Sequence, residues 1–230
     1  MIRAALIAIV MFAAGACSKP AGGDPPSKHA PTPKPTTPTA ADKLGTLAPG
    51  TGLAVGQHVP DVEALDLDGK RVRLADLVAN GPLLLVFYRG GWCPYCNYEI
   101  HEMTGAYPQY QKRGVLPVAV SVDVPEEGAK TKATYTIPFP VLSDSRLAFI
   151  NAFHVANQVD DATISKMKGF GVDLEKSSGQ THHTIAIPAL FLIDKQGVIR
   201  WAHDDPTFTV RPSTAQILAA IDAAQLGSAP

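Results

Sequence analysis

The sequence predicts one α/β domain over residues 53–227, preceded by an N-terminal segment of different character. Apolar runs of strand length alternate with segments of helical periodicity, which is the pattern of a sheet covered by helices. A strong hairpin signal, Asp68-Gly69, stands near the start of this part. Much of the proline lies before residue 53, so the compact part is shorter than the chain of 230 residues.

The first segment, residues 1–16, has the pattern of a targeting signal. Arg3 gives a positive start, residues 4–14 are apolar but too short to span a bilayer comfortably, and small residues precede Cys17. The segment resembles a bacterial lipoprotein signal peptide. That resemblance implies that Cys17 is lipidated, and Ser18 after it implies sorting to the outer membrane, facing the periplasm. Ordinary secretory cleavage, with Cys17 incidental, is the alternative.

The next segment, residues 17–52, is expected to be a disordered tether behind the lipidated cysteine. It is rich in proline and has almost no large apolar residues. Such a segment cannot bury enough surface to offset the entropy of ordering it. Stretched as polyproline II it would reach roughly 100 Å at about 3.1 Å per residue. We therefore expect the domain to be held near the envelope membrane by a lipid anchor.

The first half of the domain is expected to hold a hairpin, two buried strands and two helices. The stretch "VEALDLDGKRVRLADL" alternates around Asp68-Gly69, and "PLLLVFYR" and "VLPVAVSVD" are continuous apolar runs typical of strands covered on both faces. A helix should run from Pro94 to about Arg113, with Gly114 as its stop. A second helix is expected in "EEGAKTKATYT".

The second half is expected to add strands, helices and an insertion. "FPVLSD" and "RLAFINAF" indicate a strand and a helix, and "ALFLID" and "VIRWAHD" a strand-turn-strand. The final helix follows in "PSTAQILAAIDAAQ", where Ser213 and Gln216 are spaced for a capping box. Residues 154–187 are less regular and predict an insertion over one edge, of unknown role. The net charge of −1, without a basic surplus, argues against nucleic acid as a partner.

The pair Cys93 and Cys96 in "YRGGWCPYC" is the candidate reaction centre. Pro94 suits the first turn of a helix, which puts Cys93 at the helix tip. Cys96 shares a helical face with Ile100 and Met103 and should lie inside, with Cys93 at the open mouth. Unpaired N–H groups and the helix dipole stabilise a thiolate there, so Cys93 should be the primed nucleophile.

Other roles for the pair fit less well. A structural disulfide would close only a tiny loop and restrain the unfolded chain little. A zinc site needs four ligands, there is no second cysteine pair, and the adjacent His182 and His183 would rarely converge on one metal. Haem attachment needs histidine after the second cysteine, but Asn97 stands there. Redox catalysis is therefore favoured, without a metal.

The motif "FYRGGWCPYC", with the upstream hairpin and "IPALFLIDKQGVIR", resembles the thioredoxin fold. More narrowly, it is similar to the peroxiredoxin-like branch of the alkyl hydroperoxide reductase / thiol-specific antioxidant (AhpC/TSA) family. The resemblance implies a central mixed β-sheet flanked by helices, with an N-terminal β-hairpin extension. It also implies that no cofactor is needed beyond a redox-active Cys93–Cys96 disulfide, which a thioredoxin-like dithiol donor would reduce.

The peroxiredoxin pattern implies one assignment of the site. That pattern, Pro-x-x-x-Thr-x-x-Cys, places its attacking cysteine on Cys96, its threonine on Cys93 and its proline on Arg89. The arginine that peroxiredoxins use on peroxide and thiolate falls on Pro188. Arg89 could supply a substitute guanidinium.

The thioredoxin pattern implies another. Trp92, Cys93 and Cys96 match its Trp-Cys-x-x-Cys, and Ile187-Pro188 stands where a cis peptide belongs, so we expect a cis bond there. That bond would turn the Ile187 backbone toward the sulfurs, where a substrate chain could pair with it.

The neighbours of the pair are expected to support it. Trp92 should mainly pack, and Tyr95 should be exposed beside the sulfurs, where it could touch a substrate. Three polar residues of the following helix are expected to be solvated: Glu99, His101 and Glu102.

Three functions remain open from the sequence. The first is a thiol-dependent peroxidase that cycles between dithiol and disulfide. The second is a membrane-tethered periplasmic thiol–disulfide oxidoreductase acting on protein disulfides, in which Cys93 attacks and Cys96 releases the product. The third is a redox-inert thioredoxin-fold binding module. The sequence leaves undecided which cysteine attacks first.

Overall fold

The computed structural model describes residues 52–226. The predicted signal peptide, Cys17 and the predicted tether up to residue 51 lie outside the described residues. None of the helices in the described range is long and apolar enough to cross a membrane.

A mixed sheet of seven strands forms the centre of the domain, in the order β2-β1-β5-β4-β3-β8-β9. Its strands are β1 (Glu63–Leu65), β2 (Arg71–Arg73), β3 (Leu83–Phe87), β4 (Leu116–Ser121), β5 (Val141–Ser143), β8 (Ala189–Ile193) and β9 (Ile199–Asp204). Strands β3, β4 and β5 are parallel neighbours, while β8 and β9 add antiparallel to one side. The predicted hairpin, β1–β2, joins the sheet where β1 pairs antiparallel with β5. The expected central mixed sheet with a hairpin extension is confirmed.

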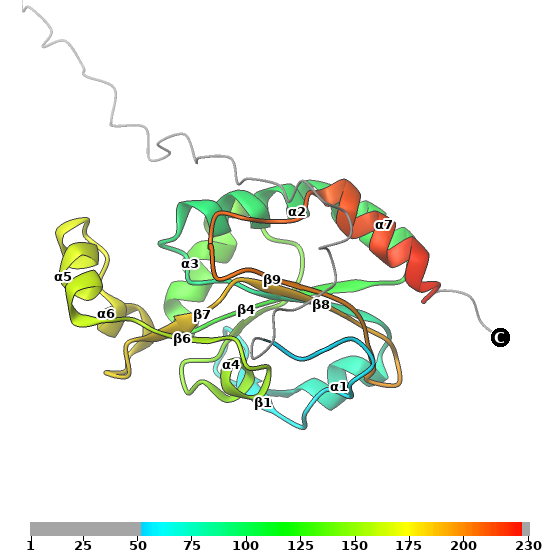
Figure 1. Ribbon diagram of the computed structural model, residues 1–230, viewed down its shortest axis with the longest axis horizontal. Helices are drawn as coiled ribbons and strands as arrows, with labels where there is room; N and C mark the ends of the chain where they lie inside the picture. Colours follow the sequence, from blue (N-terminus) through cyan, green and yellow to red (C-terminus); the bar gives the residue numbers. More distant parts are fainter. Residues whose placement is uncertain (1–51, 227–230) are drawn as a thin grey trace, which may run out of the picture. The chain divides into compact units, whose positions relative to one another are not determined.

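Helices cover both faces of this sheet. The helices of the described residues are α1 (Leu74–Ala79), α2 (Pro94–Lys112), α3 (Pro125–Tyr135), α4 (Ala148–Ala152), α5 (Asp161–Gly169), α6 (Leu174–Ser178) and α7 (Thr214–Ala224). Figure 1 shows α2, α3 and α7 on one side of the sheet and α1 and α4 on the other. The last helix carries the predicted capping box between Ser213 and Gln216, and Gly114 ends α2 with a positive φ of 66°.

Strand β3 shows why the core divides into two layers. All five of its residues are buried, as its continuous apolar sequence predicts. Leu83, Leu85 and Phe87 pack in one cluster with α1 and α4. Leu84 and Val86 pack in the other, together with both cysteines and the apolar residues of α2 and α7. The cysteine pair therefore belongs to the layer between the sheet and the α2–α7 side.

Three features differ from the expectations. Helix α1 begins at Leu74, where the sequence was assigned to the second half of the hairpin. The 154–187 segment contains α5, α6 and a separate two-stranded sheet of β6 (Ala156–Gln158) and β7 (Thr184–Ala186). No peptide bond among residues 52–226 is cis, so the predicted cis bond before Pro188 is wrong.

Candidate active site

Cys93 is the N-cap of α2 and follows a tight turn after β3. Its N–H donates to the Gly90 carbonyl, at 3.0 Å, and its own carbonyl accepts the Asn97 N–H, at 3.0 Å. Pro94 occupies the first helical turn, as predicted. Gly90 has a φ of +148°, which favours glycine, and a Cβ on Gly91 would overlap Thr131 Oγ1. The turn that presents Cys93 therefore depends on both glycines.

The two sulfurs are unbonded and 2.7 Å apart, and the Cys96 thiol donates a hydrogen bond to Cys93 Sγ. A disulfide needs little more than a further approach of the sulfurs from this position. The geometry thus allows the predicted disulfide between the two cysteines, which stand one helical turn apart. The expected exposure of Cys93 is wrong, because both residues have a relative exposure of 0 %.

The two thiols have opposite acidities. The hydrogen bond from Cys96 lowers the pKa of Cys93 to about 7, although burial opposes it, and the nearby charges of Arg89 and Arg211 lower it further. Burial raises the pKa of Cys96 well above its ordinary value, and the hydrogen bond to Cys93 adds to the effect. Near neutral pH the pair therefore carries its negative charge mainly on Cys93.

A buried ion pair that was not predicted lies under Cys96. Arg211 Nε donates to Glu99 Oε2 at 2.9 Å, and the side chains are 3 % and 4 % exposed. Arg211 Nη2 donates to Cys96 Sγ at 3.7 Å. Burial raises the pKa of Glu99, and the Arg211 charge opposes that rise. Glu99 is thus buried beside the reaction centre, and its predicted place on the solvated face of the helix is wrong.

The other two polar residues of that helix, His101 and Glu102, are exposed as expected. The two adjacent histidines turn to different partners. The His182 ring accepts the Thr184 N–H at Nδ1 and contacts the Ser145 carbonyl through Nε2, while His183 Nε2 contacts Glu175. Within residues 52–226 no three His, Cys, Asp or Glu side chains form a group that could hold a metal ion.

Arg89 lies among aromatic rings at the tip of α2. Its guanidinium carbon is 4.2 Å from the centre of the Phe208 ring and 5.0 Å from that of Trp92. Tyr95 meets Phe208 edge to face, with ring centres 5.5 Å apart. Tyr95 is half-buried rather than exposed as expected. Trp92 packs against both core layers, as predicted.

Ile187 and Pro188 lie where β8 begins. Ala189 pairs with Phe87, the last residue of β3, so Pro188 lies at the edge of the sheet from which the cysteine turn departs. The Ile187 N–H donates to the Val155 carbonyl at 2.7 Å, so the last residue of the 154–187 segment is hydrogen-bonded to its beginning. The backbone of Ile187 is therefore engaged within the domain through its N–H.

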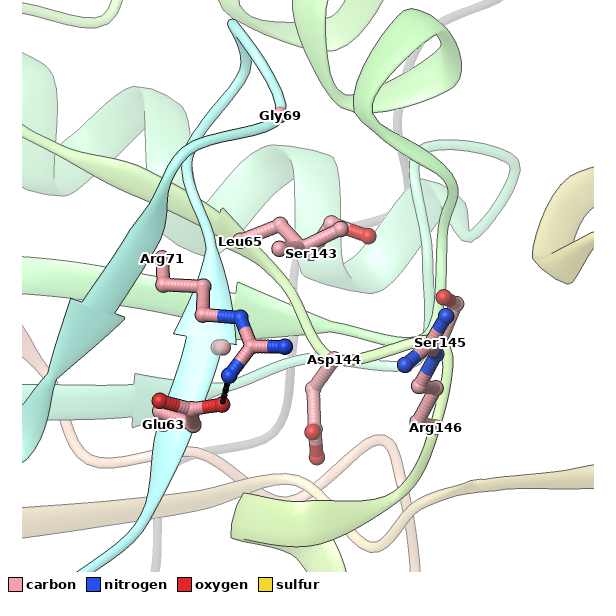
Figure 2. Close-up of a pocket in the computed structure, with 9 residues that line it drawn as sticks. Glu63, Leu65, Gly69, Arg71, Ser143, Asp144, Ser145 and Arg146 are labelled. Carbon is pink, nitrogen blue, oxygen red and sulfur yellow. Dashed lines mark ion pairs between the residues drawn. The ribbon is translucent and has the colours of Figure 1, made fainter.

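Two pockets in the described residues differ in their relation to the sulfurs. One, of about 260 Å³, is lined by Gly91 and Trp92, the two residues before Cys93, and by the buried Asp123. Burial raises the pKa of Asp123 to about 6, and its Oδ2 accepts the Gly91 N–H at 2.7 Å. The other, of about 280 Å³, lies between the hairpin and the end of β5 and is crossed by the Arg71–Glu63 ion pair (Figure 2). It has no cysteine in its lining.

The comparisons with known proteins show the family of the chain. Residues 55–202 match the model of the AhpC/TSA family. The chain belongs to the AhpC/TSA family. It is similar to the thiol-disulfide oxidoreductase ResA of Geobacillus thermodenitrificans (strain NG80-2), 30 % identical over 151 residues, 65 % of this chain and 69 % of that protein. It is also similar to ResA of Bacillus anthracis, 31 % identical over 112 residues, 48 % of this chain and 64 % of that one.

Solved structures support the fold. Peroxidoxin BcpB from Mycobacterium tuberculosis has a TM-score of 0.58 at 19 % identity, covering 75 % of this chain and 97 % of that one. Reduced Prx3 in complex with H2O2 from Vibrio vulnificus has a TM-score of 0.60 at 18 % identity, covering 74 % and 99 %. This AhpC/TSA protein therefore has a peroxiredoxin-like, thioredoxin-type fold and is an oxidoreductase, and its sequence contains the Cys-x-x-Cys pair of Cys93 and Cys96.

Proposed function

We propose that the protein reduces peroxides, with Cys93 as the attacking residue. The observation that carries this is the complete burial of a reactive pair. A protein disulfide must bring a sulfur and its flanking chain in line with the attacking thiolate. Both sulfurs here have 0 % exposure, so a small reactant needs a much smaller opening than a polypeptide does. A peroxide is such a reactant.

The chemistry balances with the groups present. The Cys93 thiolate attacks one peroxide oxygen, the O–O bond breaks, and Cys93 becomes a sulfenic acid as the alkoxide or hydroxide leaves and takes a proton. The Cys96 sulfur then attacks the Cys93 sulfur, water leaves, and the disulfide forms. Two electrons have passed from the pair to the peroxide, and a dithiol donor returns them. We propose a thioredoxin-like protein as that donor.

Arg211 supports the second step. Peroxiredoxins use an arginine on peroxide and thiolate, and the matching position here is Pro188. Arg211 Nη2 reaches Cys96 Sγ from another part of the chain, so its charge lowers the pKa of Cys96. A deprotonated Cys96 is the form that resolves the sulfenic acid. Arg89, beside Cys93, serves the first thiolate in the same way.

Single-cysteine variants test the proposal. With dithiothreitol as donor, wild-type protein should consume peroxide over many turnovers. Reduced beforehand and freed of dithiothreitol, Cys96→Ser should complete one fast turnover and stop as a sulfenic acid that a dimedone probe traps, whereas Cys93→Ser should show no fast turnover. The reverse pattern, with Cys93→Ser retaining the burst, would make Cys96 the attacker and overturn the assignment.

A second candidate is reduction of protein disulfides. The ResA proteins to which the chain is similar are named thiol-disulfide oxidoreductases, and a Cys93 with a pKa of about 7 is suited to attack a disulfide. Insulin reduction measured beside peroxide consumption separates the two. If insulin is reduced quickly and peroxide is not consumed, the peroxidase proposal fails.

We further propose that the enzyme is a lipoprotein of the bacterial cell envelope, anchored through Cys17 and facing the periplasm. The support is the signal-like sequence of residues 1–16 and the small residues before Cys17. Cys17→Ala should move the protein from the membrane fraction to the soluble fraction and abolish labelling by a radioactive fatty acid. Membrane retention without label would refute the anchor.

A further inference from the structure

The tip of α2 is covered by a loop that comes from far along the chain. Residues 205–213 connect β9 to α7 without a helix or an extended strand, and the loop is the first part of this connection, residues 205–210. The loop folds on itself, because the Thr207 N–H donates to Asp205 Oδ1 at 2.7 Å and the Val210 N–H to the Thr207 carbonyl at 2.8 Å. Arg211, at its end, is fixed to Glu99 and Cys96. The loop is thus anchored at both ends, with Phe208 near its middle.

Phe208 is the side chain through which this loop meets the cysteine turn. It is a large apolar residue with 38 % exposure. Its ring lies 4.2 Å from the Arg89 guanidinium and edge to face with Tyr95. Arg89 in turn lies over Trp92. We call these four side chains the aromatic cover; Arg89 and Trp92 stand just before Cys93 in the chain, Tyr95 stands two residues after it, and Phe208 contacts Arg89 and Tyr95.

The cover accounts for a mismatch in the site. A thiolate at a helix N-cap is a reactive group and needs an approach, yet Cys93 is fully buried. The contacts that hold Phe208 are a cation–ring contact and one ring pair, each weak compared with core packing. An irregular loop is also the kind of segment that opens at low cost. Movement of Phe208 is therefore the least costly way to expose the pair.

We propose that Phe208 determines the size of the reactant that reaches the cysteine pair: small peroxides pass the aromatic cover, and bulky disulfides are restrained by it. This inference rests on the proposed function, because it takes Cys93 as the attacking thiol. It assigns Phe208 a role in specificity and none in the bond-making steps. Cys93 then has the reactivity expected of a disulfide reductase, but the opening that leads to it is suited to peroxide.

Alkylation of the reduced protein tests the cover without any enzymatic assay. Phe208→Ala should raise the rate at which a 5-kDa polyethylene-glycol maleimide labels Cys93 by about tenfold, or about 1.4 kcal/mol in the opening equilibrium. Labelling by iodoacetamide, a small reagent, should change less than about twofold. The matched control is Phe170→Ala, since Phe170 is 77 % exposed on the 154–187 segment, and it should leave both rates unchanged. Phe208→Leu should lie between wild type and Phe208→Ala.

The same variants connect the cover to turnover. Phe208→Ala should increase insulin reduction by about tenfold and leave the rate with hydrogen peroxide within about twofold. Circular dichroism and thermal unfolding check that each variant is folded. Equal maleimide labelling of Phe208→Ala and wild type would overturn the proposal, as would an equal rise in Phe170→Ala. Because labelling needs no substrate, a protein that fails to consume peroxide still tests the cover.

Discussion

Removal of the Arg211 side chain should destabilise the protein strongly, because it leaves a charge buried alone. In Arg211→Met the Glu99 carboxylate, 4 % exposed, loses the partner at 2.9 Å. Opposite charges about 4 Å apart attract by about 4 kcal/mol at an effective dielectric constant of about 20. Loss of one partner of a buried pair costs about 3–5 kcal/mol. For a domain of this size that is a fall in Tm of roughly 6–20 °C.

The loss should depend on pH through Glu99. Burial already raises its pKa above the ordinary value of 4.5, and the Arg211→Met change removes the charge that holds the rise back. A carboxyl with a raised pKa in the folded state takes up a proton more readily folded than unfolded. The stability that Arg211→Met loses relative to wild type is therefore fully recovered below about pH 4.5, where Glu99 is protonated in both states. It is lost again as the pH rises through the raised pKa of Glu99 in the folded variant.

The assay is urea unfolding of the reduced protein at about pH 5 and about pH 8. The double variant Glu99→Gln with Arg211→Met has neither charge and should recover much of the loss. The matched control is Arg113→Met, which breaks the exposed Arg113–Asp222 pair and should lower the unfolding midpoint far less than Arg211→Met does, because an exposed ion pair contributes little to stability. A double variant no more stable than Arg211→Met, together with a loss equal at both pH values, would refute the buried-charge explanation.

Three further changes test other parts of the site. The thiolate absorbance of Cys93 should titrate with a pKa of about 7, and Arg89→Met should raise that pKa because it removes a charge that lowers it; an unchanged midpoint contradicts this. Gly91→Ala should lower the free energy of unfolding by about 1–3 kcal/mol, because the new Cβ would overlap Thr131 Oγ1. Urea unfolding measures this loss, which should be smaller when Thr131 is also changed to alanine. Ser213→Ala should lower stability by about 1 kcal/mol in thermal unfolding, because it removes the capping box of α7; no change contradicts that role.

The parts of the fold that the sequence predicted are those with local causes. Asp68-Gly69 sets the hairpin through turn chemistry, and β3 is recognisable because a strand covered on both faces is apolar throughout. Helix α1 was missed because it has only six residues and its N-cap, Arg73, makes no side-chain capping bond. Without a start signal, its apolar residues continue the alternation of the strand before it.

The parts of the site that were missed depend on contacts between distant positions. Arg211 lies 115 residues from Cys96, and no local pattern connects them. Glu99 could have been found, because it stands three residues after Cys96 and therefore near the same helical face. A carboxylate beside a buried cysteine indicates a buried partner. The contact between Arg89 and Phe208 could not be predicted either, since Phe208 and the loop that holds it come from the other end of the domain.

In the proposed mechanism, the order of attack depends on how one negative charge is shared between the two sulfurs. Alignment with peroxiredoxins puts the attacker at Cys96, while the helix N-terminus favours Cys93. The structure provides an arginine for each sulfur, but Cys96 is the donor in the bond between them and has the higher pKa. Burial is the largest cause of the raised pKa of Cys96, but oxidation of Cys93 removes the two others, the negative charge of Cys93 and the hydrogen bond to it. The Arg211 charge then acts on Cys96 without opposition from a neighbouring thiolate, so Cys96 becomes the stronger nucleophile only after Cys93 has reacted. In the proposed mechanism both arginines therefore favour the first thiolate, and Arg211, which contacts Cys96, then favours the second.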